Sequence, residues 1–206
     1  FGKPFDFPTQ SVDSVPYLIH SLALLKDLEI LDRYRDFLEK ETMRFTSRFI
    51  GPNGHKTSRG LVRPLHFSSM KDFAVRESSC YDNSMAGFLS LNLKRLKLDD
   101  PLRSFNYSEI IKENFWNGDY FFDDMQKKPY VAGDAQVFPF YCGVIRNKTM
   151  MRRAFAFVQR EGLDEPIALK YTSRNAPARF IWSERFLRGY ELDPCWAQMG
   201  PIYIRL

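Results

Sequence analysis

Residues 69–98 read SMKDFAVRESSCYDNSMAGFLSLNLKRLKL, a polar loop that runs directly into an apolar segment. The first sixteen of these residues include three acidic side chains, one arginine and several hydroxyl groups. Apolar side chains at positions 85, 88, 89, 91, 93 and 96 have the spacing of a buried or half-buried helix. We therefore expect the polar cluster on a loop and at the start of a helix, where binding and catalytic groups often lie. The alternative is a solvated loop in which Asp, Asn or Ser caps the helix.

An apolar helix followed by an amphipathic helix is a pattern that recurs along the chain. Buried inner helices are predicted after Pro16, at Asn83 and after Asp134, and each is followed by an amphipathic outer helix. A further apolar segment begins at Trp196. The sequence therefore predicts an all-α fold of three and a half helical hairpins in a single domain, residues 1–206. We expect the outer helices at 28–49, 107–115 and 149–160, and short strands at 120–123 and 167–172.

Composition and charge exclude several classes of protein. The content of 44% hydrophobic and 27% charged residues is typical of a soluble globular protein, and 206 residues suffice for one sizeable core. The net charge of +5 is spread along the chain, whereas a basic stripe would be typical of a nucleic-acid partner. No apolar run approaches the roughly 18 residues that cross a bilayer, so we expect no membrane partner.

The cysteines and histidines also argue against a metal or cofactor. Cys80, Cys142 and Cys195 lie far apart, which disfavours a disulfide framework and a zinc site and favours a reducing, cytoplasmic location. The three histidines are scattered, and the chain has no glycine-rich phosphate-binding motif. We expect neither a metal nor a cofactor.

Acidic residues mark the start of each predicted inner helix. These are Asp13, Asp82 with Asn83, Asp134 and Asp193. If the inner helices are parallel, their N-termini and these carboxylates converge on one face, where a polyhydroxylated ligand could bind. The alternative is that each Asp only caps its own helix.

Five short segments, in this order, resemble the six-hairpin α/α-toroid glycosidases of the glucoamylase-like and amylo-1,6-glucosidase (glycogen-debranching) group. Residues 11–20 are similar to that group's N-S-V-D-x-x-L-W-F-I-H segment, and residues 70–84 to the segment that bears the catalytic acid before an inner helix. Residues 115–123 resemble the turn F-W-N-x-x-x-G-Y-L-Y-D. Residues 133–136 look like the start of the next inner helix, and residues 169–172 like the strand after one more outer helix.

The resemblance implies an α/α toroid of which this chain is about half, apparently a middle fragment. It implies a glycoside hydrolase that acts on α-linked glucosides or oligosaccharides by acid–base catalysis with inversion. Asp72 would be the general acid. Asp82 is the second candidate, because residues 77–82 match the trehalase-like motif E-S-G-x-D with one extra residue. The general base would lie beyond this chain, unless the alignment shifts to Glu184 or Glu191.

The match has departures as well, since no Trp precedes Asp72 and an Asp takes the place of the usual Glu. A general acid must hold its proton near neutrality, which burial promotes and an ion pair with Arg76 would oppose. The resemblance implies that a carbohydrate substrate contacts Asp13, Arg76, Glu77, Trp116, Asp134, Gln136 and Trp196.

Two alternatives belong to other functional classes. One is a helical toroid that binds sugars or proteins without catalysis. The other is a sugar epimerase or isomerase on the same scaffold, which would normally have paired histidines at the mouths of the inner helices. His20, His55 and His66 are not expected there, and we expect His20 to be a packing residue.

Overall fold

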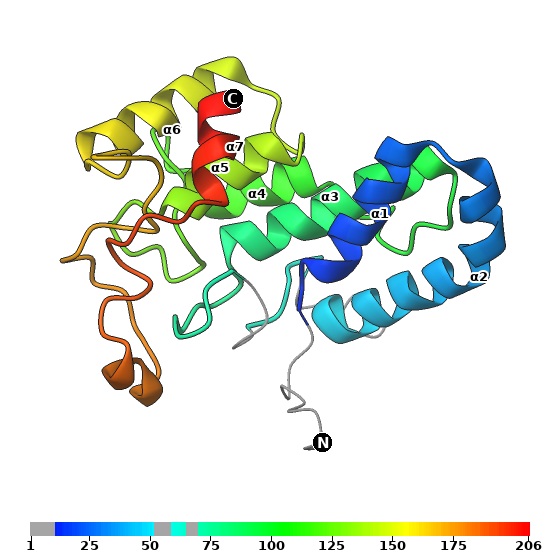
Figure 1. Cartoon of the computed structure of the whole chain (residues 1–206), viewed down its shortest axis with the longest axis horizontal. Helices are drawn as coiled ribbons and strands as arrows, with labels where there is room; N and C mark the ends of the chain where they lie inside the picture. Colours follow the sequence, from blue (N-terminus) through cyan, green and yellow to red (C-terminus); the bar gives the residue numbers. More distant parts are fainter. Residues whose placement is uncertain (1–10, 52–58, 65–69) are drawn as a thin grey trace.

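The computed structural model describes residues 11–51, 59–64 and 70–206, and within these ranges the chain is mostly helical (Figure 1). A π-helical turn, Thr46–Ile50, continues the second helix, and a 3₁₀ turn spans Trp182–Phe186. The described residues contain single β-bridges but no sheet. The α-helices of the described ranges are α1 (Ser14–Leu25), α2 (Leu28–Phe45), α3 (Cys80–Leu96), α4 (Tyr107–Phe115), α5 (Gly133–Tyr141), α6 (Lys148–Arg160) and α7 (Met199–Arg205).

Inner and outer helices alternate in the predicted order, but the prediction that α1 is buried is wrong. Only Pro16, Ile19 and Ala23 of α1 are buried, and Leu18, Leu24 and Leu25 are exposed. Helix α1 packs on α3, α3 packs on α5, and α5 packs on α7, while α2, α4 and α6 each pack on the inner helix that precedes them. Helix α3 is buried along most of its length because other helices contact it on several sides, whereas α6 buries only Ala154 and Val158. Figure 1 shows the α1–α2 hairpin at one end of the molecule and the segment between α6 and α7 at the other.

The predicted aspartate caps are wrong. Asp13 occupies the N-cap position of α1, but its side chain makes no capping hydrogen bond. Ser79 caps α3 by accepting the amide of Asp82 at 3.0 Å, so Asp82 lies within the first turn. Asp134 also lies within the first turn, in α5, and Asp193 lies before the N-cap of α7. The carboxylates are therefore left to make other contacts.

The predicted strands appear only as isolated bridges within the described residues. Trp116 pairs with Phe121, and Lys170 pairs with Cys195.

His20 packs on Phe88, with the two ring centres 4.4 Å apart, in keeping with its predicted packing role. His55 and His66 lie outside the described residues.

A glycine allows the start of α5 to approach the segment that follows α6. The amide of Gly133 donates to the carbonyl of Tyr171 at 2.6 Å. A Cβ on Gly133 would lie 2.2 Å from the carbonyl oxygen of Lys170, which is closer than atoms can approach. Only glycine therefore fits at this contact.

No helix in the described part of the chain is long and apolar enough to cross a membrane.

We predict that Gly133→Ala lowers the free energy of unfolding by about 1–3 kcal/mol, because backbone must shift to make room for the methyl group. Ser21→Ala, on the exposed side of α1, should change it by less than about 0.5 kcal/mol. Urea denaturation of the two variants tests this difference. Equal stability of Gly133→Ala and the wild type would contradict the close approach.

Candidate active site

The loop before α3 is held against two other parts of the chain. The amides of Asp72, Phe73 and Ala74 all donate to the carboxylate of Glu191, the last two at 2.8 and 2.9 Å. Further along, the amide of Cys80 donates to the carbonyl of Asp123 at 2.9 Å. These bonds attach the loop to the segment around Glu191 and to the turn that contains Asp123, so the backbone of the loop has a defined position.

A buried cluster of four charged residues lies beneath this loop. We call Lys71, Arg76, Asp123 and Asp134 the ion cluster. Lys71 Nζ lies 3.2 Å from Asp123 and 3.1 Å from Asp134, and an Arg76 nitrogen lies 3.4 and 3.3 Å from the same two carboxylates. The hydroxyl of Tyr130 also donates to Asp123 at 2.7 Å. Each cation thus contacts both anions, and the two pairs of opposite charges balance.

The opposite charges of the ion cluster counteract the effect of burial on the pKa values of Lys71 and Asp123. Burial disfavours the charged ammonium group, but the carboxylates of Asp123 and Asp134 raise the pKa of Lys71 above its usual value. Burial likewise disfavours the Asp123 carboxylate, yet Lys71 and Arg76 lower the pKa of this group. Lys71, Arg76 and Asp123 are therefore ionised near neutral pH. Removing one member would leave an uncompensated buried charge.

Asp82 is a further buried carboxyl group beside the ion cluster. Its side chain is buried, and Oδ1 has no hydrogen-bond partner within the described residues. Burial raises the pKa of Asp82 to about 6, and the charges of Asp13 and Asp134 act in the same direction, while Arg76 and the Ser79 hydrogen bond oppose them. Asp82 thus has the environment of a carboxyl group that keeps its proton close to neutrality.

Asp72 and Asp13 are the more accessible acids of the site. The side chain of Asp72 is exposed, and partial burial together with the charge of Asp13 raises its pKa. The hydroxyls of Ser11 and Tyr81 donate to Asp13, the latter at 2.8 Å. Arg76 pairs with Asp123 and Asp134, so the ion pair that would have lowered the pKa of Asp72 is not formed.

The starts of three of the four predicted inner helices therefore meet, whereas Asp193 lies before the N-cap of α7 and is not among the contacts that join them. Tyr81 of α3 donates to Asp13 of α1, and Arg76 connects the loop before α3 to Asp134 of α5. The Cys80 thiol also donates to the carbonyl of Ala135 at 3.9 Å. The result is a group of carboxyls at the mouth of the inner helices, with Asp82 buried among them.

Several residues expected to contact a ligand instead hold the protein together. Both ends of the Gln136 amide are occupied, because it accepts the Phe121 amide at 2.8 Å and donates to the Phe121 carbonyl at 2.8 Å. Arg76 and Asp134 are buried in the ion cluster. Trp116 packs on Phe121 with ring centres 4.8 Å apart. The side chains of these four residues (Arg76, Trp116, Asp134 and Gln136) are thus engaged in contacts within the protein.

Two predicted contact residues keep a position suited to a ligand. Glu77 is exposed, with its backbone amide bonded to Asp124 at 2.7 Å. Trp196 is half-buried, packs on Tyr171 and Tyr190 with ring centres 5.1 and 4.7 Å apart, and has an indole N–H without a partner in the described chain. Glu77 is therefore open to solvent, whereas the Trp196 indole N–H is buried and has no partner in the described chain.

Sequence reasoning missed Lys71 and Asp123. The signals were present, since Lys71 adjoins the predicted acid and Asp123 ends an aromatic turn. Their pairing joins positions 52 residues apart, which a single sequence does not reveal.

No group of His, Cys, Asp and Glu in the described ranges has the arrangement of a metal site.

Comparison of the chain with protein families and with curated proteins gives no match.

The two kinds of buried acid should affect stability in opposite ways. The pKa of Asp82 rises from 3.8 to about 6 on folding, so its contribution favours the fold below pH 4 and is lost as the pH rises through 6. We predict that Asp82→Asn is more stable than the wild type at pH 8, by up to about 3 kcal/mol, and that this advantage disappears near pH 4.

Asp123 provides the matched comparison, because its pKa is lowered and its contribution is lost as the pH falls. Asp123→Asn should destabilise the protein by about 3–5 kcal/mol at pH 8 and by less in acid. Urea denaturation of both variants from pH 4 to pH 8 measures the two trends. The same sign of pH dependence in both variants would contradict this assignment.

Proposed function

We propose that the protein is a glycoside hydrolase and that Asp82 is its general acid. The observation that carries this proposal is the buried Asp82 carboxyl, whose pKa is raised to about 6 and whose Oδ1 has no partner in the described chain. Cleavage of a glycosidic bond requires a carboxyl group that is protonated near neutrality and transfers its proton to the leaving oxygen. Asp82 combines burial with a position at the start of an inner helix.

Asp82 replaces Asp72 as our first candidate for the acid. Asp72 is exposed and only partly desolvated, so its environment holds a proton less firmly. Asp72 and Asp13 are better suited to accept hydrogen bonds from sugar hydroxyls. Glu77 and the aromatic face of Trp196 complete the proposed contacts to an α-linked glucoside.

The proposed scaffold is part of an α/α toroid. Its support is the packing order, in which each inner helix contacts the next and each outer helix covers its own inner helix. The carboxyls lie at the N-terminal ends of these inner helices, where the resemblance implies that a carbohydrate substrate is contacted.

No general base is assigned among the described residues. Glu191 uses its carboxylate to hold the loop before α3, and Glu184 accepts the amide of Gly189 at 2.7 Å. An inverting reaction needs a second carboxylate about 6.5–9.5 Å from the acid, with room for a water molecule. The engagement of both glutamates favours one second candidate function, a sugar-binding toroid without catalysis.

Hydrolysis of an α-glucoside panel tests the proposal. We expect glucose release from at least one of maltose, isomaltose, trehalose and a limit dextrin. Asp82→Asn should reduce kcat/KM by about 10²–10⁴-fold, while Asp72→Asn should reduce it less. Asp119→Asn, at an exposed turn, is the control and should leave it unchanged. Since Asp82 must be protonated to act, kcat/KM should fall as the pH rises above about 6.

Three results would count against this assignment. Activity in Asp82→Asn with loss in Asp72→Asn would return the acid to the exposed position. Absence of hydrolysis with saturable binding of an oligosaccharide would favour the non-catalytic toroid. Absence of both would remove carbohydrate as the substrate class.

A further inference from the structure

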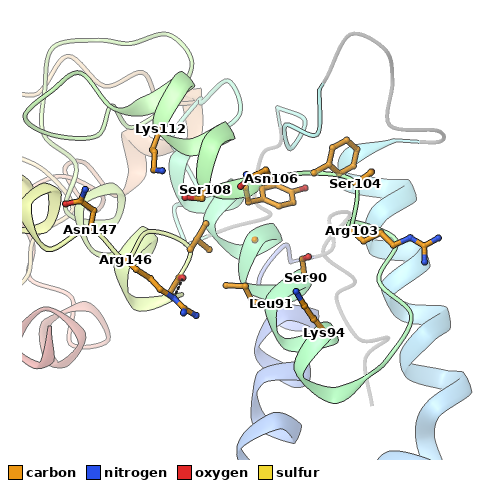
Figure 2. A pocket seen from close by; sticks show the side chains of 15 residues that line it. Ser90, Leu91, Lys94, Arg103, Ser104, Asn106, Ser108, Lys112, Arg146 and Asn147 are labelled. Carbon is orange, nitrogen blue, oxygen red and sulfur yellow. Dashed lines mark hydrogen bonds between the residues drawn. The ribbon is translucent and has the colours of Figure 1, made fainter.

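A groove lies beside the far half of α3, away from the carboxyls. Its walls are α3 itself, the start of α4 with the loop before it, and the loop after α5 (Figure 2). It has a volume of about 930 Å³, which is within the range of small-molecule sites. Along α3 its lining runs from Gly87 to Lys94, five to twelve residues after Asp82, or about 7.5–18 Å along the helix. The groove is therefore separate from the candidate active site.

Four cations surround this groove, each from a different segment. They are Lys94 of α3, Arg103 of the loop that follows, Lys112 of α4 and Arg146 of the loop after α5 (Figure 2). None of the described residues that line the groove is acidic. The lining thus has a consistent positive charge, whereas the chain as a whole carries mixed charges.

Nearby carboxylates neutralise these cations only weakly. Arg103 lies 3.8 Å from Asp99, and Lys112 lies 3.1 Å from Glu109, in pairs whose side chains are 38% exposed or more. Such pairs contribute roughly 0–1 kcal/mol because solvent screens them. Lys94 and Arg146 form no ion pair with the described residues.

The uncharged groups of the lining are mostly hydrogen-bond donors. The side-chain oxygen of Asn106 accepts the Glu109 amide, and that of Asn147 accepts the Thr149 amide. Each oxygen is thereby engaged, and the NH₂ group is the end left to donate. Ser104 and Ser108 add hydroxyls to the lining, and Val144 adds an apolar side chain. Cations, amide NH₂ groups and hydroxyls next to an apolar wall suit an anionic organic molecule.

We propose that this groove binds a small organic phosphate, such as a sugar phosphate or a nucleotide. A phosphate group has several acceptor oxygens and carries negative charge opposite to that of the cations that line the groove. A divalent metal would need carboxylate or carbonyl ligands, and a neutral sugar would not use the positive charge of the lining. This site is independent of the proposed hydrolase activity.

Calorimetric titration of the protein with ATP, glucose 6-phosphate, inorganic phosphate and maltose tests the proposal. We expect saturable binding of ATP or glucose 6-phosphate, and the stronger of the two identifies the nucleotide or the sugar phosphate as the source. The double variant Lys94→Ala/Arg146→Ala should weaken that binding about tenfold or more, because charged hydrogen bonds are lost. Arg152→Ala/Arg174→Ala removes the same charge from exposed positions outside the groove and should leave binding unchanged.

Four outcomes would overturn the proposal. These are no saturable binding of either organic phosphate, equal binding of inorganic phosphate, an equal loss in the control double variant, or loss of maltose binding in the groove variant alone. Thermal denaturation checks that each variant is folded. If the groove double variant unfolds, Lys94→Met preserves the apolar stem of the side chain and serves for the same comparison.

Discussion

The pairing of two buried cations with two buried carboxylates is the interaction on which the described site depends. Lys71 and Arg76 come from the loop before α3, Asp123 from the turn after α4, and Asp134 from the first turn of α5. Since each cation contacts both anions, the cluster joins three segments that no sheet connects. Losing one charge would leave one unit of buried charge uncompensated in the interior.

The same balance leaves Asp82 in a different state from its neighbours. The two cations are already paired with Asp123 and Asp134, so the attraction of Arg76 only partly offsets the burial of Asp82. Carboxyl groups in one small region thus acquire opposite pKa shifts, lowered for Asp123 and raised for Asp82. Pairs of acids whose surroundings separate their pKa values are typical of acid–base sites. This separation supports a proton-donating role for Asp82.

The helices were predictable because the spacing of apolar residues is a local feature of the sequence. The individual side-chain contacts were not predictable. The expected bounds 107–115 match α4, and the alternation of inner and outer helices follows from which segments carry charge. The approach of the α1 and α3 starts, where Tyr81 donates to Asp13, was also expected from the polar residues at helix starts. The role of Gln136 depends on the Phe121 backbone, and that of Glu191 on amides more than 110 residues away. Such distant partners leave no periodic signal in one sequence.

The most direct test of this account is the titration of the Asp82 carboxyl itself. The carboxyl carbon of ¹³C-labelled Asp82, assigned by comparison with Asp82→Asn, can be followed by NMR between pH 3 and pH 8. The account predicts an apparent pKa near 6, with the Asp123 carboxyl titrating below its usual value. A pKa for Asp82 at or below about 4 would show that the ion cluster compensates its charge, and would contradict its role as a proton donor.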